Sequence, residues 1–317
     1  MKALLPAFIA ISRASAIIEP MTNLSPIAVG RIPLEPVDID ELDQGKNEVY
    51  QGMIAVGNER YQSFIKVLPT KQLVNELVAY VVGRALGFPI PTGFLVRASA
   101  SDIPDSQLLT ELIEQSGEEE VFVFGSQDAQ LPSLARYARD IYVNNTEFDE
   151  VDETLSSTRS DDDMTYFEDK DNFLLWKELI IFDAWIANTD RHPGNLLVAE
   201  GGNAFWIDHT HCLTGEDWDC DKWQDDAICK NIVLTTWRQR CLPEEKMSLA
   251  SRTDELIAQI NELDLDQLSE SAHLLNFLTG ADAKKIQRFL EGRAQHLQSL
   301  GAQQITPRST QPRREVS

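Results

Sequence analysis

The 317-residue chain is poor in positive charge. It has 28 lysine and arginine residues against 51 aspartate and glutamate residues, which gives a formal net charge of −23 at pH 7. A surface with this excess of carboxylates repels the phosphates of nucleic acids and of anionic lipid headgroups. The composition therefore argues against nucleic acid or a membrane as a partner.

The chain also lacks a hydrophobic run long enough to cross a bilayer. The apolar stretch at residues 3–11 is too short for this and is interrupted by Pro6. Residues 14–16, Ala-Ser-Ala, imitate a signal-peptide cleavage site, and Met21 offers an alternative start. We expect residues 1–35 to be a poorly ordered extension of a cytoplasmic protein.

Cysteines are few and widely spaced. The four are Cys212, Cys220, Cys229 and Cys241. They form no Cys-x-x-Cys pair, and spacings of eight and nine residues match no common structural zinc site, even with His209 and His211 nearby. Reduced thiols in this number fit a cytoplasmic compartment.

The most informative segment is residues 187–209. Here Asp190 and Asn195 stand in an Asp-x-x-x-x-Asn spacing, and a second aspartate, Asp208, ends the apolar run 205–207. An amide oxygen and a carboxylate are the hard ligands that Mg²⁺ prefers. A second aspartate, free of metal, can accept the proton of an attacking hydroxyl. The pattern predicts phosphoryl transfer from a magnesium-bound nucleotide.

An isolated Asp-x-x-x-x-Asn can also be a simple turn that caps a helix. The surrounding sequence favours the chemical interpretation. Residues 173–187 are apolar almost all round, which indicates a buried helix, and residues 196–198 and 205–207 are typical of a short hairpin. This hairpin would bring Asn195 and Asp208 to the same open end.

An upstream strand and helix supply the other expected groups. Lys66 lies inside the apolar strand 61–67, and Glu76 lies in an amphipathic helix that ends near Gly87. A lysine on a strand that pairs with a glutamate on the next helix can hold nucleotide phosphates. Taken singly, Lys66 could instead protect an edge strand from aggregation, and Glu76 could be an ordinary solvated helix residue.

The phosphate-covering turn is short. No Gly-x-Gly-x-x-Gly is present, and the hairpin of residues 50–56 and 61–67 carries only Gly57 at its tip. Residues 94–96 and 121–124 are two further predicted strands. We expect residues 125–127, just after the second of these strands, to form a linking segment whose backbone can hydrogen-bond the nucleotide base. Phe124 would then lie beside that base.

Together these segments resemble the bacterial HipA-like kinase domain family and, more distantly, phosphatidylinositol and eukaryotic protein kinases. The resemblance is carried by residues 74–78, 86–91, 182–197 and 207–209. It implies a two-lobed α+β protein-kinase-like fold, with a small, mainly β N-lobe and a larger, mainly α C-lobe. It also implies binding of ATP and Mg²⁺ and phosphorylation of a hydroxyl, on either a protein or a small molecule.

By position, the resemblance assigns roles to single residues. Asp190 matches the catalytic aspartate, Asn195 and Asp208 match the metal ligands, Lys66 matches the phosphate-binding lysine and Glu76 its partner. His192 stands where protein kinases often have a phosphate-contacting lysine and, if protonated, would offset charge on the transferred group. The sequence departs from protein kinases in having Ile-Asp-His for Asp-Phe-Gly, no glycine triplet and no Ala-Pro-Glu.

Two alternatives remain open from these departures. One is a catalytically weak pseudokinase that acts as a nucleotide-binding or interaction module. The other is a metal-dependent hydrolase in which Asp190, His192, Asp208 and His209 hold two ions about 4 Å apart.

The two lobes that the resemblance implies give the expected domain order. The N-lobe spans 36–127 and the C-lobe spans 171–302, with amphipathic helices expected at 254–263 and 283–300. Between the lobes, 128–170 is an acidic insertion: from Glu147 to Asp171 there are eleven acids and two basic residues. Residues 303–317 are expected to be a disordered tail.

Overall fold

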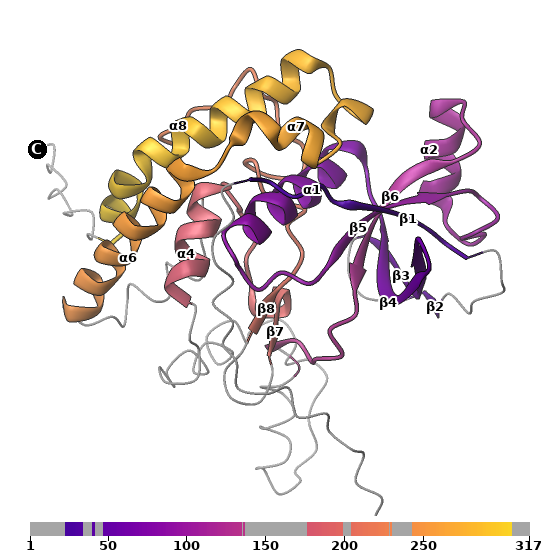
Figure 1. Cartoon of the computed structure of the whole chain (residues 1–317), viewed down its shortest axis with the longest axis horizontal. Helices are drawn as coiled ribbons and strands as arrows, with labels where there is room; N and C mark the ends of the chain where they lie inside the picture. Colours follow the sequence, from indigo (N-terminus) through magenta and orange to yellow (C-terminus); the bar gives the residue numbers. More distant parts are fainter. Residues whose placement is uncertain are drawn as a thin grey trace, which may run out of the picture.

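The computed structural model describes residues 23–33, 40–41, 47–134, 136, 176–198, 204–227, 229 and 243–305. The strands are β1 (Ala28–Arg31), β2 (Asp40–Glu41), β3 (Glu48–Val56), β4 (Glu59–Val67), β5 (Gly93–Ala98), β6 (Val121–Gln127), β7 (Leu196–Val198) and β8 (Ala204–Trp206). The α-helices are α1 (Thr70–Ala85), α2 (Gln107–Ser116), α4 (Trp176–Trp185), α6 (Pro243–Glu262), α7 (Leu268–Ser271) and α8 (Gly280–Ile305). Figure 1 shows the sheet at one end of the molecule and helices α4, α6 and α8 at the other.

The main sheet has six strands in the order β1-β5-β6-β4-β3-β2. β3 and β4 form the predicted hairpin, with Gly57 at the turn in the left-handed region at φ +58°. Among the strands of the described ranges, only β1 and β5 pair in parallel. Because β4 lies between β6 and β3, Lys66 is on an interior strand and is not an edge-strand lysine.

Helix α1 lies between the sheet and helices α4, α6 and α8 (Figure 1). Twelve of its sixteen residues are buried, because its faces contact β5 and β6 on one side and α7 on another. It ends where Leu86 caps it, and the following Gly87 has φ +72°, as its expected C-terminal role requires. The position of α1 fixes Glu76 at the centre of the molecule.

Helices α4, α6 and α8 pack against one another and form most of the helical end of the molecule, opposite the sheet. Arg293 of α8 is fully buried and donates to the carbonyls of Ala184 and Trp185, which end α4 and have no partner within the helix. The Trp185 indole donates in return to the Leu290 carbonyl, with N and O 2.9 Å apart. These bonds hold the end of α4, from which the 187–195 loop leaves.

Several boundaries differ from the expectations. Residues 28–31, expected in the N-terminal extension, form β1, and residues 254–262 of the expected helix 254–263 are the second half of the longer helix α6. Helix α2, which the sequence did not indicate, is capped by Ser106 and ended by Gly117 at φ +71°. The expected link 125–127 is wrong: these residues belong to β6 and pair with β4 and β5.

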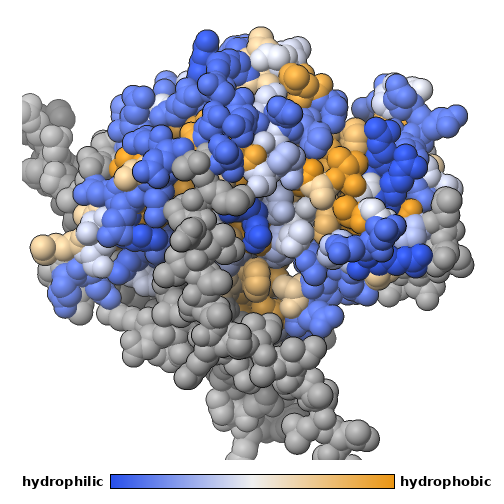
Figure 2. All heavy atoms as spheres, viewed as in Figure 1, coloured by the Kyte–Doolittle hydropathy of each residue, from blue (hydrophilic) through white to orange (hydrophobic). Residues whose placement is uncertain are grey.

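Most of the acidic insertion and residues 306–317 of the tail lie outside the described residues. On the face in Figure 2, hydrophilic side chains cover most of the described surface, and apolar surface gathers where helices meet the sheet. Among the helices of the described ranges, none has both the length and the apolar character that a bilayer crossing requires.

Candidate active site

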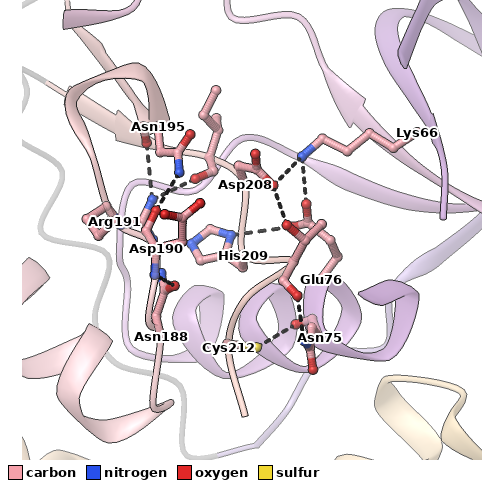
Figure 3. Close-up of polar contacts among 12 residues, drawn as sticks. Lys66, Asn75, Glu76, Asn188, Asp190, Arg191, Asn195, Asp208, His209 and Cys212 are labelled. Atoms are coloured by element: carbon pink, nitrogen blue, oxygen red, sulfur yellow. Dashed lines mark hydrogen bonds and ion pairs between the residues drawn. The ribbon is translucent and has the colours of Figure 1, made fainter. Parts of the chain in front are cut away.

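A buried lysine is bonded to two carboxylates that come from different parts of the chain. The Nζ atom of Lys66 on β4 is 2.6 Å from Oε1 of Glu76 on α1 and 3.3 Å from Oδ1 of Asp208, which follows β8 (Figure 3). The Lys66 and Glu76 side chains are only 12% and 2% exposed. Lys66, Glu76 and Asp208 are thus brought together as the sequence predicted.

The three groups hold one another in their charged forms. Burial lowers the pKa of the Lys66 ammonium, but the charges of Asp208 and Glu76 outweigh this and raise it above its ordinary value. Burial likewise opposes ionisation of both acids, yet the Lys66 charge lowers the pKa of Glu76 and of Asp208. The cluster therefore presents a lysine cation and a carboxylate anion side by side at neutral pH.

His209 and Thr210 complete this cluster. His209 is buried, and its Nδ1 atom is 3.5 Å from Oε2 of Glu76. Burial lowers the pKa of His209 despite the Glu76 contact, so the imidazole is neutral at pH 7. The Thr210 hydroxyl donates to Oδ1 of Asp208 at 2.9 Å, which leaves the Oδ2 oxygen of Asp208 for a further ligand.

Asn195 and Asp208 lie at the same end of the small hairpin. Asn195 immediately precedes β7 and Asp208 comes two residues after β8, and the Ile207 amide donates to the Asn195 carbonyl at 3.0 Å. The Asn195 Nδ2 atom donates to the Asp190 carbonyl at 2.9 Å, so its Oδ1 oxygen is left to face a cation. Figure 3 shows Asp190, Asn195 and Asp208 around one space, with Lys66 reaching toward Asp208 from the sheet.

The residues fit a magnesium ion by their donor set. One amide oxygen and one carboxylate are enough protein ligands for Mg²⁺, which keeps water and phosphate oxygens as its others. Within the described ranges, no group of three or more His, Cys, Asp or Glu side chains is arranged to hold a metal.

Asp190 lies where a second substrate can reach it. Its side chain is 47% exposed, and its Oδ2 atom is 3.9 Å from Nε2 of His211, a residue that the sequence analysis considered only as a zinc ligand. The Asp190 amide donates to Oδ1 of Asn188 at 3.2 Å, which holds the backbone at this position.

Arg191 was not identified from the sequence, although it is fully buried. Its guanidinium makes a bidentate pair with Asp183 of α4, at 3.0 and 3.1 Å. Its Nη1 atom donates to the carbonyls of Asn195 and Ile207 at 3.1 and 2.6 Å. Arg191 therefore joins α4, the 190–195 loop and the strand end before Asp208.

The three other predicted site residues are placed less directly. The Nδ1 atom of His192 accepts from the Gly194 amide at 3.0 Å, so the ring in this arrangement carries its proton at Nε2, and the doubly protonated form expected from the sequence would lose this bond. Gly57 lies at the tip of the β3–β4 turn, with open space beside it. Phe124 is opposite Lys66 in the β6–β4 register, but its side chain is buried in the core with α1.

Comparisons with known proteins agree on a kinase-like fold. The family model described as phosphatidylinositol 3- and 4-kinase matches residues 87–277, a range that contains Asp190, Asn195 and Asp208 but neither Lys66 nor Glu76. A solved structure, the crystal structure of a Helicobacter pylori proinflammatory kinase CtkA, is similar with a TM-score of 0.50 and 14% sequence identity. The similarity covers 86% of this chain and 99% of that one. No curated protein matches.

Proposed function

This chain belongs to the family of phosphatidylinositol 3- and 4-kinases, and we propose that it transfers the γ-phosphate of ATP to a hydroxyl group. The observation that carries the proposal is the contact of Lys66 with Asp208. These residues are 142 positions apart, and their side chains are 3.3 Å apart in a partly buried cluster. We further propose that it resembles HipA-like kinases most, because of the Asn-Thr-Asp-Arg-His motif at residues 188–192.

In the proposed mechanism each side chain has a separate task. Lys66, held by Glu76, binds the α- and β-phosphates, while Asn195 Oδ1 and Asp208 Oδ2 would hold Mg²⁺. The ion, when bound, neutralises charge on the phosphate oxygens. The acceptor oxygen forms a bond to the γ-phosphorus, the bond to the β–γ bridging oxygen breaks and ADP leaves. Asp190 takes the acceptor proton. Positioning and electrostatics supply most of the acceleration.

The charge around the site guides the choice of acceptor. Residues 210–227, which follow Asp208, contain six acids and one lysine. Two of these acids, Glu216 and Asp217, are engaged by Gln72 and Lys71 of α1, which places the segment beside the site. A phosphorylated inositol lipid would meet repulsion here. We therefore propose a Ser- or Thr-type protein hydroxyl, in the cytoplasm where ATP is supplied, over an anionic lipid headgroup.

One observation favours a second candidate, the catalytically weak nucleotide-binding module. The β3–β4 turn offers a single glycine, Gly57, to cover the phosphates. A turn that contributes few backbone amides to the phosphates leaves the γ-phosphate poorly oriented for transfer. In that case Mg-ATP would raise the melting temperature of the protein, but no phosphate would be transferred.

The test is Asp190→Asn in an assay that follows transfer of labelled γ-phosphate to the chain itself, to a basic protein and to phosphatidylinositol vesicles. We expect transfer to fall by roughly 100-fold or more, since a positioned base contributes about that factor. Binding of Mg-ATP, followed by thermal shift, should change little because Asp190 is no metal ligand in this scheme.

Two further variants make the test specific. Asp208→Asn should weaken Mg-ATP binding as well as transfer. Asp266→Asn removes a carboxylate that is 78% exposed in the helical part and should leave both unchanged. Full transfer by the Asp190 variant would remove Asp190 from the mechanism. Labelling of the lipid in preference to protein would overturn the proposed acceptor.

A further inference from the structure

The loop that follows the small hairpin has a strained backbone. Asp208, Leu213 and Thr214 all have positive φ, at 57°, 53° and 81°, although none of them is a glycine. Such conformations are unfavourable for residues with a Cβ atom and persist only where surrounding contacts enforce them. The contacts that hold residues 208–215, here called the metal loop, therefore determine where the Asp208 carboxylate points.

Backbone hydrogen bonds with residues 186–189, just before Asp190, hold one edge of the metal loop. The Leu213 and Thr214 amides donate to the carbonyls of Ile186 and Ala187 at 2.8 and 3.1 Å, just beyond the end of α4. The Thr189 amide donates to the His211 carbonyl at 3.1 Å. These bonds fix the loop relative to Asp190, but they do not connect it to α1.

The fully buried side chain of Asn75 on α1 connects α1 to the backbone of the loop, beside the contact of His209 Nδ1 with Glu76 Oε2 at 3.5 Å. The Asn75 Nδ2 atom donates to the carbonyls of Thr210 and Gly215, at 2.6 and 2.9 Å, and so spans the turn from one end to the other. Its Oδ1 atom accepts from the Trp218 indole at 2.8 Å. Its backbone carbonyl is 3.2 Å from the Cys212 thiol, which donates to it (Figure 3).

Every polar atom of the Asn75 side chain is thus used to hold the segment behind Asp208. The next residue in the chain is Glu76, which holds Lys66. A displacement of α1 at this point would therefore move the Lys66 partner and the metal loop together. Neighbouring hydrogen-bonded groups of this kind orient metal ligands and commonly change metal affinity by large factors.

Resting on the proposed function, we propose that Asn75 is a positioning residue that sets the Asp208 carboxylate for Mg²⁺. It does so by holding the turn from Thr210 to Gly215 in its strained conformation. The role needs an amide: an aspartate of the same shape would lose both donors and would place negative charge against two carbonyl oxygens.

The experiment compares Asn75→Asp with the matched control Gln72→Ala. Gln72 is also a buried amide of α1, but it reaches only the Glu216 side chain, at 3.5 Å, and no backbone group of the metal loop. The first readout is hydrogen exchange of the amides of residues 212–215. The second is the Mg²⁺ concentration needed for half-maximal binding of a non-hydrolysable ATP analogue.

For Asn75→Asp we expect faster exchange in residues 212–215 and a half-maximal Mg²⁺ concentration raised roughly tenfold or more. High Mg²⁺ should restore binding, because only the ligand geometry is impaired. General destabilisation would instead lower the fraction of protein that binds at every Mg²⁺ concentration. Gln72→Ala should match the unmodified protein in both measurements.

If Asn75→Asp fails to fold, Trp218→Phe decides the matter, since it removes one donor to Asn75 and keeps an aromatic ring. It should shift both readouts in the same direction by a smaller factor. Unchanged exchange and unchanged Mg²⁺ dependence in the variant that folds would overturn the role of Asn75. Failure of the unmodified protein to bind the analogue would instead overturn the proposed function.

Discussion

At the scale of single residues, the site depends on one cation shared by two acids. Lys66 cannot be buried alone without a large cost in hydration, and neither can Glu76, whose side chain is 2% exposed. Each is stable in its charged form because the other is present. A buried pair of this kind contributes little net stability, but removal of one member leaves an unpaired charge.

This argument predicts a strong non-additivity. Lys66→Met should lower the free energy of unfolding by about 3 kcal/mol, because the Glu76 carboxylate loses its ammonium partner. The double variant Lys66→Met with Glu76→Leu should recover most of that loss, since two apolar side chains replace the pair, while phosphate transfer stays absent. Urea unfolding at pH 7 measures both. Losses that simply add would show that the pair is not energetically coupled.

At the scale of elements, α1 is the part on which the site depends most. It carries Asn75 and Glu76 and packs against α4 through a position with no side chain. A Cβ atom at Gly83 would lie 2.3 Å from Cδ1 of Ile90 and 3.0 Å from Cζ of Phe182. The ring of Phe182 packs in turn against Trp206 and His209. The approach of the two helices at Gly83 therefore also sets the hairpin that presents Asp208.

Gly83→Val should lower stability by about 1–3 kcal/mol, because Phe182 is buried among aromatic rings and cannot move aside freely. The gain in helix propensity over glycine, below about 1 kcal/mol, is too small to offset this. Gly280→Ala is the matched control: its Cβ would meet open space in α8, so it should be neutral or stabilising. Thermal unfolding of the two variants provides the measurement. Equal stability of both would mean that the α1–α4 contact adjusts without cost.

The same elements show what the sequence could predict. The β3–β4 hairpin, α1 and the β7–β8 pair were recognisable because each has a local period and a local stop signal, such as Gly57 or Gly87. The proximity of Lys66 and Glu76 followed from residue types in a familiar order. The roles of Lys66, Asp190, Asn195 and Asp208 remain predictions, since geometry alone does not test a reaction.

Other features could not be read locally. In the sequence alone, Asn75 and Arg191 look like solvated polar residues. In the structure they are buried and bonded to carbonyl groups up to 140 positions away, which the local sequence does not indicate. The residues 125–127 look like a link because Gly-Ser-Gln has low strand propensity. Pairing with β4 and β5 overrides this and extends β6. Such outcomes are decided by tertiary contacts and leave no periodic signal.

At the scale of the whole molecule, a short N-terminal segment joins the sheet to the helices. β1 pairs with β5, and the residues just before it contact α7. The Ile27 amide donates to the Ser271 carbonyl at 2.9 Å, and the Ser271 hydroxyl donates to the Leu24 carbonyl at 3.0 Å. Leu24 and Ile27 are both buried in the larger core, with exposed fractions of 3% and 2%. The segment thus connects parts of the fold that come from opposite ends of the chain.

Ile27→Ala should therefore destabilise the protein by about 2–4 kcal/mol, because it leaves a cavity between β1 and α7. Val29→Ala is two residues further along on β1 and is the control: Val29 is 45% exposed, so its loss should stay within about 0.5 kcal/mol. Denaturant unfolding monitored by tryptophan fluorescence reports mainly on the helices and the 204–223 region, where several of the tryptophans lie. Because the cavity lies at the junction, the sheet and helices should lose stability together, and circular dichroism should give the same midpoint. A midpoint that shifts equally in both variants would show that this segment does not join the two parts.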